Sequence, residues 1–191
     1  MAHVTFYLVR HGQSESNALG LLSSYPEVPG RTVRHLTEQG ISEVKETAEK
    51  LRQENIDVII ASPLTRTVET AAIISEATGI PVLQDIRLRE TNFGIYDAGP
   101  VERFFNAYSK PEERILTDGG DGVESFEDMR ARVVSILDDV KRECDGKKVV
   151  LVSHADTLEQ IHGVLVGEGV RASAIGWSPK TGSMLKIKYE L

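Results

Sequence analysis

The apolar residues of the chain form two kinds of pattern, short uninterrupted runs and longer stretches in which they recur every three or four positions. The uninterrupted runs predict buried strands, because a strand covered on both faces leaves almost no polar position. A last strand, at residues 185–191, is predicted by strict alternation of apolar and charged residues, which is typical of a half-exposed edge strand. The predicted buried strands lie at residues 3–9, 58–61, 81–83 and 148–153.

The periodic stretches predict amphipathic helices whose ends are marked by capping residues and glycines. Thr37 is placed to cap the first helix, and Leu36 is placed to pack on Ile41 as a hydrophobic staple. The predicted helices run from Thr37 to Asn55, from Arg66 to Gly79, from Ser125 to Gly146 and from Leu158 to Gly167.

The order of these elements predicts a three-layer α/β/α sandwich around a mostly parallel sheet with one antiparallel edge strand. Strands alternate with helices through most of the chain, and such alternation gives parallel strands joined by helices that cover both faces. The chain has 191 residues, of which 40% are hydrophobic, and this is the size of a single-core domain. We therefore expect one domain over residues 1–191.

Residues 88–122 fit neither pattern. This segment combines several glycines and prolines with three aromatic residues, Phe104, Phe105 and Tyr108. Long irregular segments within a domain commonly carry function, and the aromatic side chains indicate packed material. We therefore expect a lid-like segment that covers a site.

The charge of the chain limits what it binds. The formal net charge of −7 argues against a nucleic-acid or anionic-membrane surface, since both need a basic patch, so an anion must be bound by a local cluster of cations. No apolar run approaches the roughly 20 residues that cross a bilayer, and the N-terminus lacks the basic flank of a signal peptide, so we expect a cytoplasmic protein. Cys144 is the only cysteine, which excludes an internal disulfide and predicts an unreactive surface thiol.

Basic residues follow three of the predicted strands. Arg10 and His11 come at the end of the first strand. Arg66 lies a few residues after the second strand, and His154 directly follows the fourth, so we expect all four to converge where the parallel strands end. Two guanidinium groups can bind phosphate oxygens, and a neutral imidazole can attack phosphorus to form a phosphohistidine. The alternatives are backbone-bound imidazoles and, for Arg66, a helix ion pair with Glu69.

Further polar residues near these strand ends suit a phosphoryl-transfer site. Ser14 and Asn17 follow the first strand and can donate hydrogen bonds to phosphate oxygens. Glu90 is the candidate that protonates the leaving oxygen, because a carboxyl group held beside an anionic phosphate has a raised pKa. The alternative for Glu90 is a surface ion pair with Arg87 or Arg89.

Different short motifs follow one another along the chain, at residues 8–17 (LVRHGQSESN), 36–40 (LTEQG), 62–71 (SPLTRTVETA), 89–94 (RETNFG) and 153–154 (SH). Together they resemble the signature of the histidine phosphatase superfamily, also called the phosphoglycerate mutase-like family. A tripeptide such as Arg-His-Gly is a weak signal alone, but the ordered blocks together are strong. The resemblance spans nearly the whole chain and implies a phosphoglycerate mutase-like fold with no metal or organic cofactor.

The resemblance also implies a role for each matching residue. His11 matches the phosphorylated nucleophile, and Arg10 and Arg66 match the residues that clamp the phosphate. His154 matches the second histidine, which hydrogen-bonds to the phosphoryl group. The remaining matches are Ser14 and Asn17, at phosphate-contacting positions, and Glu90, at the position of the proton donor.

Three places depart from the family's pattern. Ala155-Asp156 follows the second histidine where glycine is usual. Alanine keeps the backbone N–H group, so Ala155 remains a candidate hydrogen-bond donor to the phosphate, but alanine tolerates positive φ poorly. Tyr96-Asp97-Ala98 stands where Trp-Glu-Gly is usual. Ser16 stands where many members have tryptophan.

These observations predict a metal-independent phosphatase that hydrolyses a small-molecule phosphomonoester through a phosphohistidine at His11. A phosphoglycerate mutase is the first alternative, although the middle of the chain is short for the larger lid of such mutases. The others are an inactive phosphate-binding member and, with Asp156 close to a strand-end histidine, a metal-dependent phosphatase. A phosphorylated small molecule is the expected partner, and a homodimer is compatible with the sequence.

Overall fold

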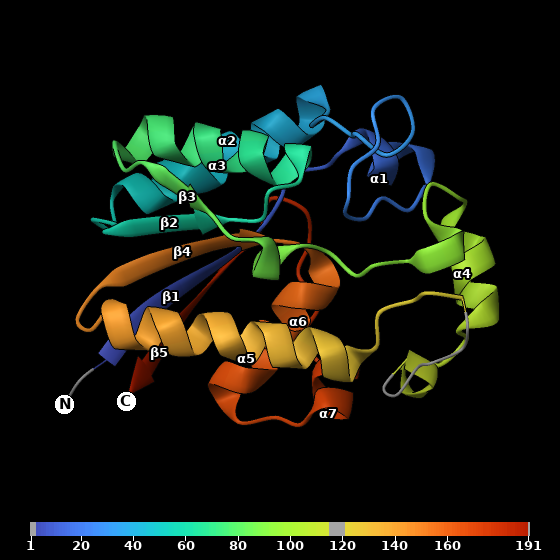
Figure 1. Ribbon diagram of the computed structural model, residues 1–191. Helices are drawn as coiled ribbons and strands as arrows, with labels where there is room; N and C mark the ends of the chain where they lie inside the picture. Colours follow the sequence, from blue (N-terminus) through green and yellow to red (C-terminus); the bar gives the residue numbers. More distant parts are fainter. Residues whose placement is uncertain (1–2, 115–120, 191) are drawn as a thin grey trace.

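The computed structural model describes residues 3–114 and 121–190 and is built around a five-stranded sheet (Figure 1). The strand order is β3-β2-β4-β1-β5, in which β1 and β5 are antiparallel and the other neighbours are parallel. The predicted mostly parallel sheet with one antiparallel edge strand is confirmed. Its strands are β1 (His3–Arg10), β2 (Val58–Ala61), β3 (Val82–Gln84), β4 (Lys148–Ser153) and β5 (Met184–Glu190).

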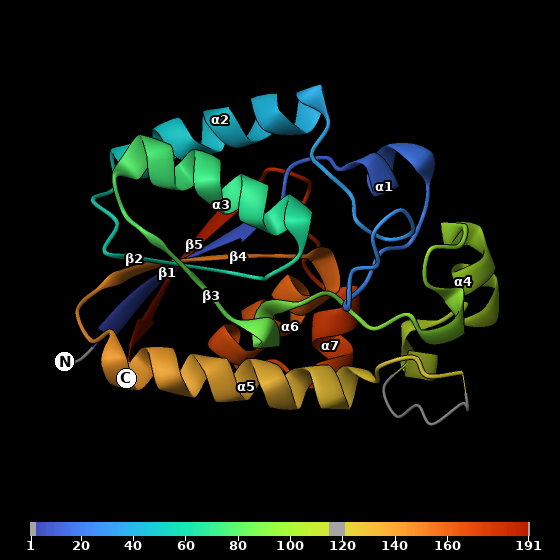
Figure 2. The same cartoon turned by 45° about the horizontal axis from the view of Figure 1, so that its top comes forward.

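Helices cover both faces of the sheet and give the predicted three layers (Figures 1 and 2). On one face lie α2 (Glu38–Arg52) and α3 (Thr65–Thr78), which pack against each other and on the sheet. On the other face lie α5 (Phe126–Glu143) and α6 (Ala155–Val166), with α7 (Val170–Ile175) packed on α6. The central strands β1 and β4 are buried between these layers, which explains why their sequences have so few polar positions.

The start of α2 bears out one prediction and contradicts another. Thr37 caps the helix, since its Oγ1 accepts a hydrogen bond from the N–H of Gly40 at 3.1 Å. Leu36 is buried but Ile41 is exposed, so the predicted staple between them is wrong. Gly40 is the residue of this turn that faces inward, and a Cβ atom there would lie only 2.0 Å from the carbonyl oxygen of Gln13. Ile41 is one residue further round the helix and therefore faces solvent.

The described part of the segment predicted to be irregular combines short helical pieces with stretches that have no regular structure. It contains two single 3-10 turns, at Gly94–Tyr96 and Pro111–Arg114, and the helix α4 (Val101–Ala107). Beyond the carboxyl ends of β1 and β4 it lies near α1 (Glu15–Leu19), a short helix that the apolar pattern did not predict (Figure 1). Residues 115–120 of this segment lie outside the described residues. Its small core, apart from the main ones, consists of Leu22, Phe93, Phe104 and Val123.

With 18 residues, α5 spans the second face of the sheet. Its apolar side, which includes Met129, Val133 and Leu137, is fully buried, and its other side is charged. Beyond its last residue Cys144 is also buried in the core, so the predicted surface position of this thiol is wrong, and burial raises its pKa. Within the described ranges, no helix is long and apolar enough to cross a membrane.

Candidate active site

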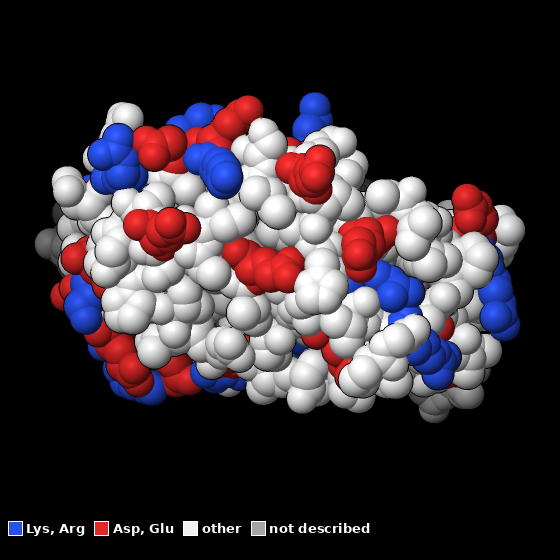
Figure 3. Space-filling view, turned by 90° about the horizontal axis from the view of Figure 1, so that it is seen from above, with Lys and Arg blue, Asp and Glu red and all other residues white. Residues whose placement is uncertain are grey.

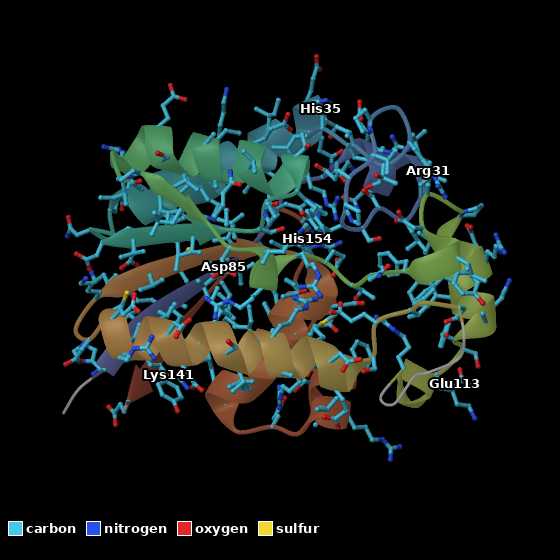
Figure 4. The ribbon with its side chains drawn as sticks, in the orientation of Figure 1. Arg31, His35, Asp85, Glu113, Lys141 and His154 are labelled. Atoms are coloured by element: carbon cyan, nitrogen blue, oxygen red, sulfur yellow. The ribbon has the colours of Figure 1, made fainter. Side chains whose placement is uncertain are left out.

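The ends of β1 and β4 bring two histidines together. The strand register pairs Arg10 with Ser153, so the next residues of the two strands, His11 and His154, leave the sheet at the same place. Their rings meet edge to face with centroids 5.2 Å apart, and both are buried. Figure 4 shows His154 at the centre of the molecule, where β4 passes into α6. The structure therefore places both predicted imidazoles in one site.

Arg66 lies between the two imidazoles. It belongs to the first turn of α3, and it is 3% exposed. Its Nε donates a hydrogen bond to Nε2 of His11 at 3.2 Å, and its Nη2 donates to Nδ1 of His154 at 3.0 Å. Ser23 holds the same guanidinium from the other side, through its Oγ at 3.1 Å and its carbonyl oxygen at 2.9 Å. The alternative pairing with Glu69 is wrong, because that carboxylate binds the backbone N–H of Leu36.

These hydrogen bonds define which nitrogen of each imidazole carries the proton. A guanidinium has donors only, so Nε2 of His11 and Nδ1 of His154 must each present a lone pair to Arg66. The proton of His11 then lies on Nδ1, which donates to the carbonyl oxygen of Gly12 at 2.7 Å. The proton of His154 lies on Nε2, which donates to Oγ of Ser62 at 2.8 Å. Both rings are therefore neutral, and His11 presents an unprotonated Nε2 to the site.

The electrostatics of the site keep these rings neutral. Burial, and after it the positive charge of Arg66, holds the pKa of His11 and that of His154 well below the usual 6.5. Burial also lowers the pKa of Arg66 to about 10, which leaves this guanidinium charged at neutral pH. The site thus combines uncharged imidazoles with a fixed positive charge.

Arg10 supplies a second positive charge. Its Nη1 donates to the carbonyl oxygen of Pro179 at 2.8 Å, which anchors the side chain at the end of β1. Its Nε is buried and has no hydrogen-bond partner among the described residues. A buried donor without a partner is costly unless an anion or water meets it, so this nitrogen suits an anionic ligand.

Glu90 is buried close to these charges rather than exposed on the surface. It is 8% exposed, and burial, followed by the negative charge of Asp156, raises its pKa to about 7. The alternative of a surface ion pair is wrong, because Arg87 binds Asp85 at 2.7 Å and Arg89 binds Glu124 at 3.0 Å. A carboxyl group with this pKa can both give and take a proton near neutral pH.

Ser14 and Asn17 make local contacts at the start of α1. The buried Oγ of Ser14 donates to Oδ1 of Asn17 at 2.8 Å, and the backbone N–H of Ser14 donates to the same oxygen at 3.0 Å. The side chain of Asn17 is exposed. The structure therefore uses both side chains to cap α1, and their contact with a phosphate stays a prediction.

The residues that replace the family's glycines behave differently from each other. Ala155 is the first residue of α6 and takes an ordinary helical conformation, so its methyl group causes no strain and its N–H belongs to the free first turn. Ala98 takes a φ of 62°, in the left-handed region that favours glycine. Of these two replacements, strain is therefore confined to Ala98, in the segment of residues 88–122.

Asp156, near the start of α6, binds two residues of the segment 88–122. Its Oδ2 accepts hydrogen bonds from Oγ1 of Thr91 at 2.7 Å and from Nη2 of Arg114 at 2.6 Å. Burial opposes ionisation of Asp156, but Arg114 and Thr91 outweigh it and lower its pKa. Arg114 also stacks on the ring of Phe126, 4.1 Å from its centroid. Asp156 is therefore an anion bound to an arginine, which weakens the metal-dependent alternative.

A cavity of about 440 Å³ opens next to these residues. Ala155 and Asp156 line it on the side of α6, and Phe105 and Arg114 line it on the side of residues 88–122. A cavity of about 480 Å³ between β2, β3 and α5 is slightly larger. Neither cavity is lined by the imidazoles or by Glu90, but the smaller one begins at Ala155, the residue directly after His154.

Charge on the outer surface is arranged differently from charge in the site. On the face seen from above, acidic and basic side chains are interspersed (Figure 3). In the site, in contrast, Arg66 donates hydrogen bonds to both imidazoles, and the positive charge of Arg10 is near enough to lower the pKa of His11. Within the described ranges, no three His, Cys, Asp or Glu side chains are grouped so that they could hold a metal ion.

Several residues of the site were not predicted. Ser23, which holds Arg66, lies in a stretch without a motif, and only the fold brings it to the site. Ser62, which holds His154, stands inside the segment 62–71, so its place in that motif was the available signal. Arg114 had no signal, because its partner Asp156 is 42 residues away in the sequence.

Comparisons with known proteins show which proteins the chain is similar to. A family model described as the histidine phosphatase superfamily (branch 1) matches residues 6–190. Among curated proteins, the chain is similar to the probable phosphoglycerate mutase GpmB of Yersinia pestis, with 33% identity over 170 residues, which cover 84% of this chain and 74% of the relative. The protein of the same name from Yersinia pseudotuberculosis has the same identity and coverage.

Similar solved structures support the fold. One called mycobacterial hydrolase 1 has a TM-score of 0.84 at 22% identity and covers 97% of this chain and 92% of its own. A mycobacterial glucosyl-3-phosphoglycerate phosphatase has a TM-score of 0.79 at 23% identity, with coverage of 95% and 88%. An alpha-ribazole phosphatase from Shigella flexneri has a TM-score of 0.78 at 19% identity, with coverage of 95% and 89%. The predicted fold class is confirmed.

Proposed function

Since the chain belongs to the histidine phosphatase superfamily, we propose that it is a metal-independent phosphatase that hydrolyses a small-molecule phosphomonoester through a phosphohistidine at His11. The observation that supports this most directly is the hydrogen bond from Arg66 to Nε2 of His11. It leaves the lone pair of a neutral imidazole on the nitrogen that faces the guanidinium groups. A nucleophile and the charges that bind its target are then at one place.

Substrate binding begins with the two arginines. A phosphate dianion accepts hydrogen bonds more strongly than a neutral imidazole does, so its oxygens take the donors of Arg66 that now reach His11 and His154. The free Nε of Arg10 is a further donor for the same oxygens. Release of Arg66 from His11 frees the lone pair of Nε2 to face phosphorus. The negative charge is met by guanidinium groups, so no metal ion is required.

The first chemical step forms the Nε2–P bond of His11 as the bond between phosphorus and the ester oxygen breaks. Glu90, in its protonated form, gives its proton to the departing oxygen, so the alcohol leaves uncharged. In the second step water attacks phosphorus, the Glu90 carboxylate takes a proton from that water, and the Nε2–P bond breaks. Inorganic phosphate leaves, and His11 and Glu90 return to their initial states.

A phosphoglycerate mutase is the second candidate, because the curated relatives bear that name. A mutase returns the phosphoryl group to an oxygen of its substrate, whereas a phosphatase gives it to water. An inactive phosphate-binding protein is the third candidate, on the strength of the strained Ala98 and the replaced glycine at Ala155. The three candidate functions are distinguished by whether the chain turns over a phosphate ester and by which product it releases.

The test is phosphate release by the purified chain from a panel of phenyl, sugar and nucleoside phosphates, with and without EDTA. We expect release from at least one ester and no loss of rate with the chelator. Loss of activity with EDTA would contradict the metal-independent mechanism. Faster interconversion of 3- and 2-phosphoglycerate than release of phosphate would favour the mutase, and binding of phosphate without turnover would favour the inactive protein.

The dependence of kcat/KM on pH follows from the pKa of Glu90. Because that pKa is raised to about 7, Glu90 is protonated below this pH and loses its proton above it, so kcat/KM falls as the pH rises through about 7. Protonation of His11 limits the acid side only well below pH 6.5. Asp156→Asn removes a negative neighbour, which eases ionisation of Glu90 and moves the alkaline decline to lower pH.

The control for this profile is Asp138→Asn, the same change at an exposed position of α5. Its profile is expected to match that of the unmodified chain. Glu90→Gln cannot transfer a proton, so it should lower kcat by about 100-fold to 1,000-fold and remove the alkaline decline. An alkaline decline that stays in place in both Asp156→Asn and Glu90→Gln would show that another group titrates.

A further inference from the structure

The cavity beside Ala155 has the size and lining of a small-molecule site. Its volume of about 440 Å³ lies within the range of such pockets. Phe105 and Tyr108, at the end of α4, and Phe126, at the start of α5, give it aromatic walls. Asp156 and Glu159 line it from the first turns of α6, directly after His154. Because α6 begins directly after His154, this part of the lining lies next to the candidate active site.

The cavity has no unpaired cation among its described residues. Arg114 is the one basic residue in the described lining, and its Nη2 is bound to Asp156 at 2.6 Å and to Thr91 at 3.0 Å. Its guanidinium also lies between the rings of Phe126 and Phe104, 4.1 Å and 5.1 Å from their centroids. The positive charge of Arg114 is thus balanced by Asp156, and a second anion of the ligand would find no counterion here.

Glu159 gives the cavity an acidic character. Its side chain is buried at 9% exposure, and it lies one helical turn after Asp156. Burial first, and then the negative charge of Asp156, raises the pKa of Glu159 to about 8. At neutral pH its carboxyl group is therefore mostly protonated and can donate a hydrogen bond to a hydroxyl group. An ammonium group beside it would favour the charged carboxylate, whereas a carboxylate of the ligand would find Arg114 already paired with Asp156.

We propose that this cavity holds the alcohol part of the substrate, and that this alcohol carries hydroxyl or ammonium groups and no second anionic group. The proposal rests on the phosphatase function proposed above and narrows its substrate class. A carboxylate or a second phosphate finds no unpaired cation in the described lining, while the aromatic walls accept a flat or apolar skeleton. Phosphoglycerates, which carry a carboxylate, fall outside this class.

Three esters of matched reactivity test the proposal: phenyl phosphates with a hydroxymethyl, an aminomethyl or a carboxymethyl group at position 4. The methylene group separates the charge from the ring, so the three phenols are leaving groups of similar acidity. We expect kcat/KM for the carboxymethyl ester to be about tenfold or more below that for the hydroxymethyl ester. The aminomethyl ester should equal or exceed the hydroxymethyl ester.

Substitutions of Asp156 and Glu159 test whether these side chains cause the preference. In Asp156→Asn combined with Glu159→Gln, the ratio of kcat/KM for the carboxymethyl ester to that for the aminomethyl ester should rise by about tenfold. Glu76→Gln makes the same change of charge on the exposed face of α3 and should leave that ratio unchanged. A ratio that stays constant in the double variant would overturn the assignment of selectivity to these side chains.

Binding separates this proposal from the phosphatase function itself. The three esters are titrated by calorimetry into His11→Gln, which keeps the cavity and lacks the nucleophile. The same ranking in Kd supports the cavity assignment even if the unmodified chain hydrolyses none of the esters, in which case only the proposed function fails. Equal Kd values for the three esters, or tightest binding of the carboxymethyl ester, would overturn the assignment whatever the rates.

Discussion

Replacing His11 with glutamine is expected to lower kcat for phosphate release by about 10,000-fold or more, because the chain then has no atom at this place that can form the bond to phosphorus. Glutamine can still accept a hydrogen bond from Arg66, so the buried guanidinium keeps a partner. The loss should therefore appear in kcat while the far-ultraviolet circular dichroism spectrum stays unchanged. Steady-state and single-turnover phosphate release measure it.

The matched control is His35→Gln. His35 is an exposed histidine that binds Glu69 at 2.6 Å outside the site, and its substitution should leave kcat unchanged. Equal rates in His11→Gln and in the unmodified chain would show that another group attacks phosphorus. That result would refute the assigned nucleophile even if the protein is a phosphatase.

The second large effect is expected for Arg66→Lys, which keeps a positive charge and loses the planar fork. Three separate partners, His11, His154 and Ser23, are bound by one guanidinium here, and an ammonium group cannot reach all of them at once. The ammonium group would stabilise the negative charge of the phosphoryl group in the transition state less well, so we expect kcat/KM to fall by about 1,000-fold. Rates with a good leaving group and with a poor one should fall by similar factors.

Arg52→Lys is the control for this substitution. Arg52 is exposed on α2 and binds Glu49 at 2.9 Å, so the change should have no effect on rate. The thermal midpoint of Arg66→Lys should be measured beside it, because a buried ammonium with fewer partners also lowers stability. Activity of folded Arg66→Lys within about threefold of the unmodified chain would contradict the role assigned to this guanidinium.

The sheet could be predicted from the sequence because its strands are buried on both faces. A run such as residues 58–61 leaves no polar position to compete with a strand, and the alternation at residues 185–191 marks an edge. The ends of β1 and β4 are fixed by this pattern, so the convergence of His11 and His154 follows from general rules of parallel sheets. Chemistry at strand ends is therefore well suited to prediction.

The structure of residues 88–122 could not be predicted because it depends on distant partners. The helix α4 is held by Phe104 in a small core with Leu22, and Arg114 is held by Asp156. No periodic pattern within residues 88–122 carries this information. The exposure of Ile41 was not predicted for the same reason. The close approach of Gly40 to the backbone of Gln13 sets which side of α2 faces inward.

Glu90 lies between these two cases. Its place in the segment 89–94 made it a candidate, but neighbouring arginines left a surface ion pair open. In the structure those arginines form ion pairs with Asp85 and Glu124, and Glu90 is buried near Asp156. The raised pKa of Glu90 is therefore a property of the fold, because it depends on burial and on a carboxylate 66 positions later in the sequence.

The most direct measurement is rapid acid-free quenching of the chain during turnover of a ³²P-labelled phosphomonoester, followed by mapping of the labelled peptide. We predict a label that forms and decays as fast as phosphate is released, resists alkali, is lost in acid, and lies on the peptide that contains His11. Turnover without any protein-bound label, or an acid-stable label on a different residue, would contradict the phosphohistidine mechanism.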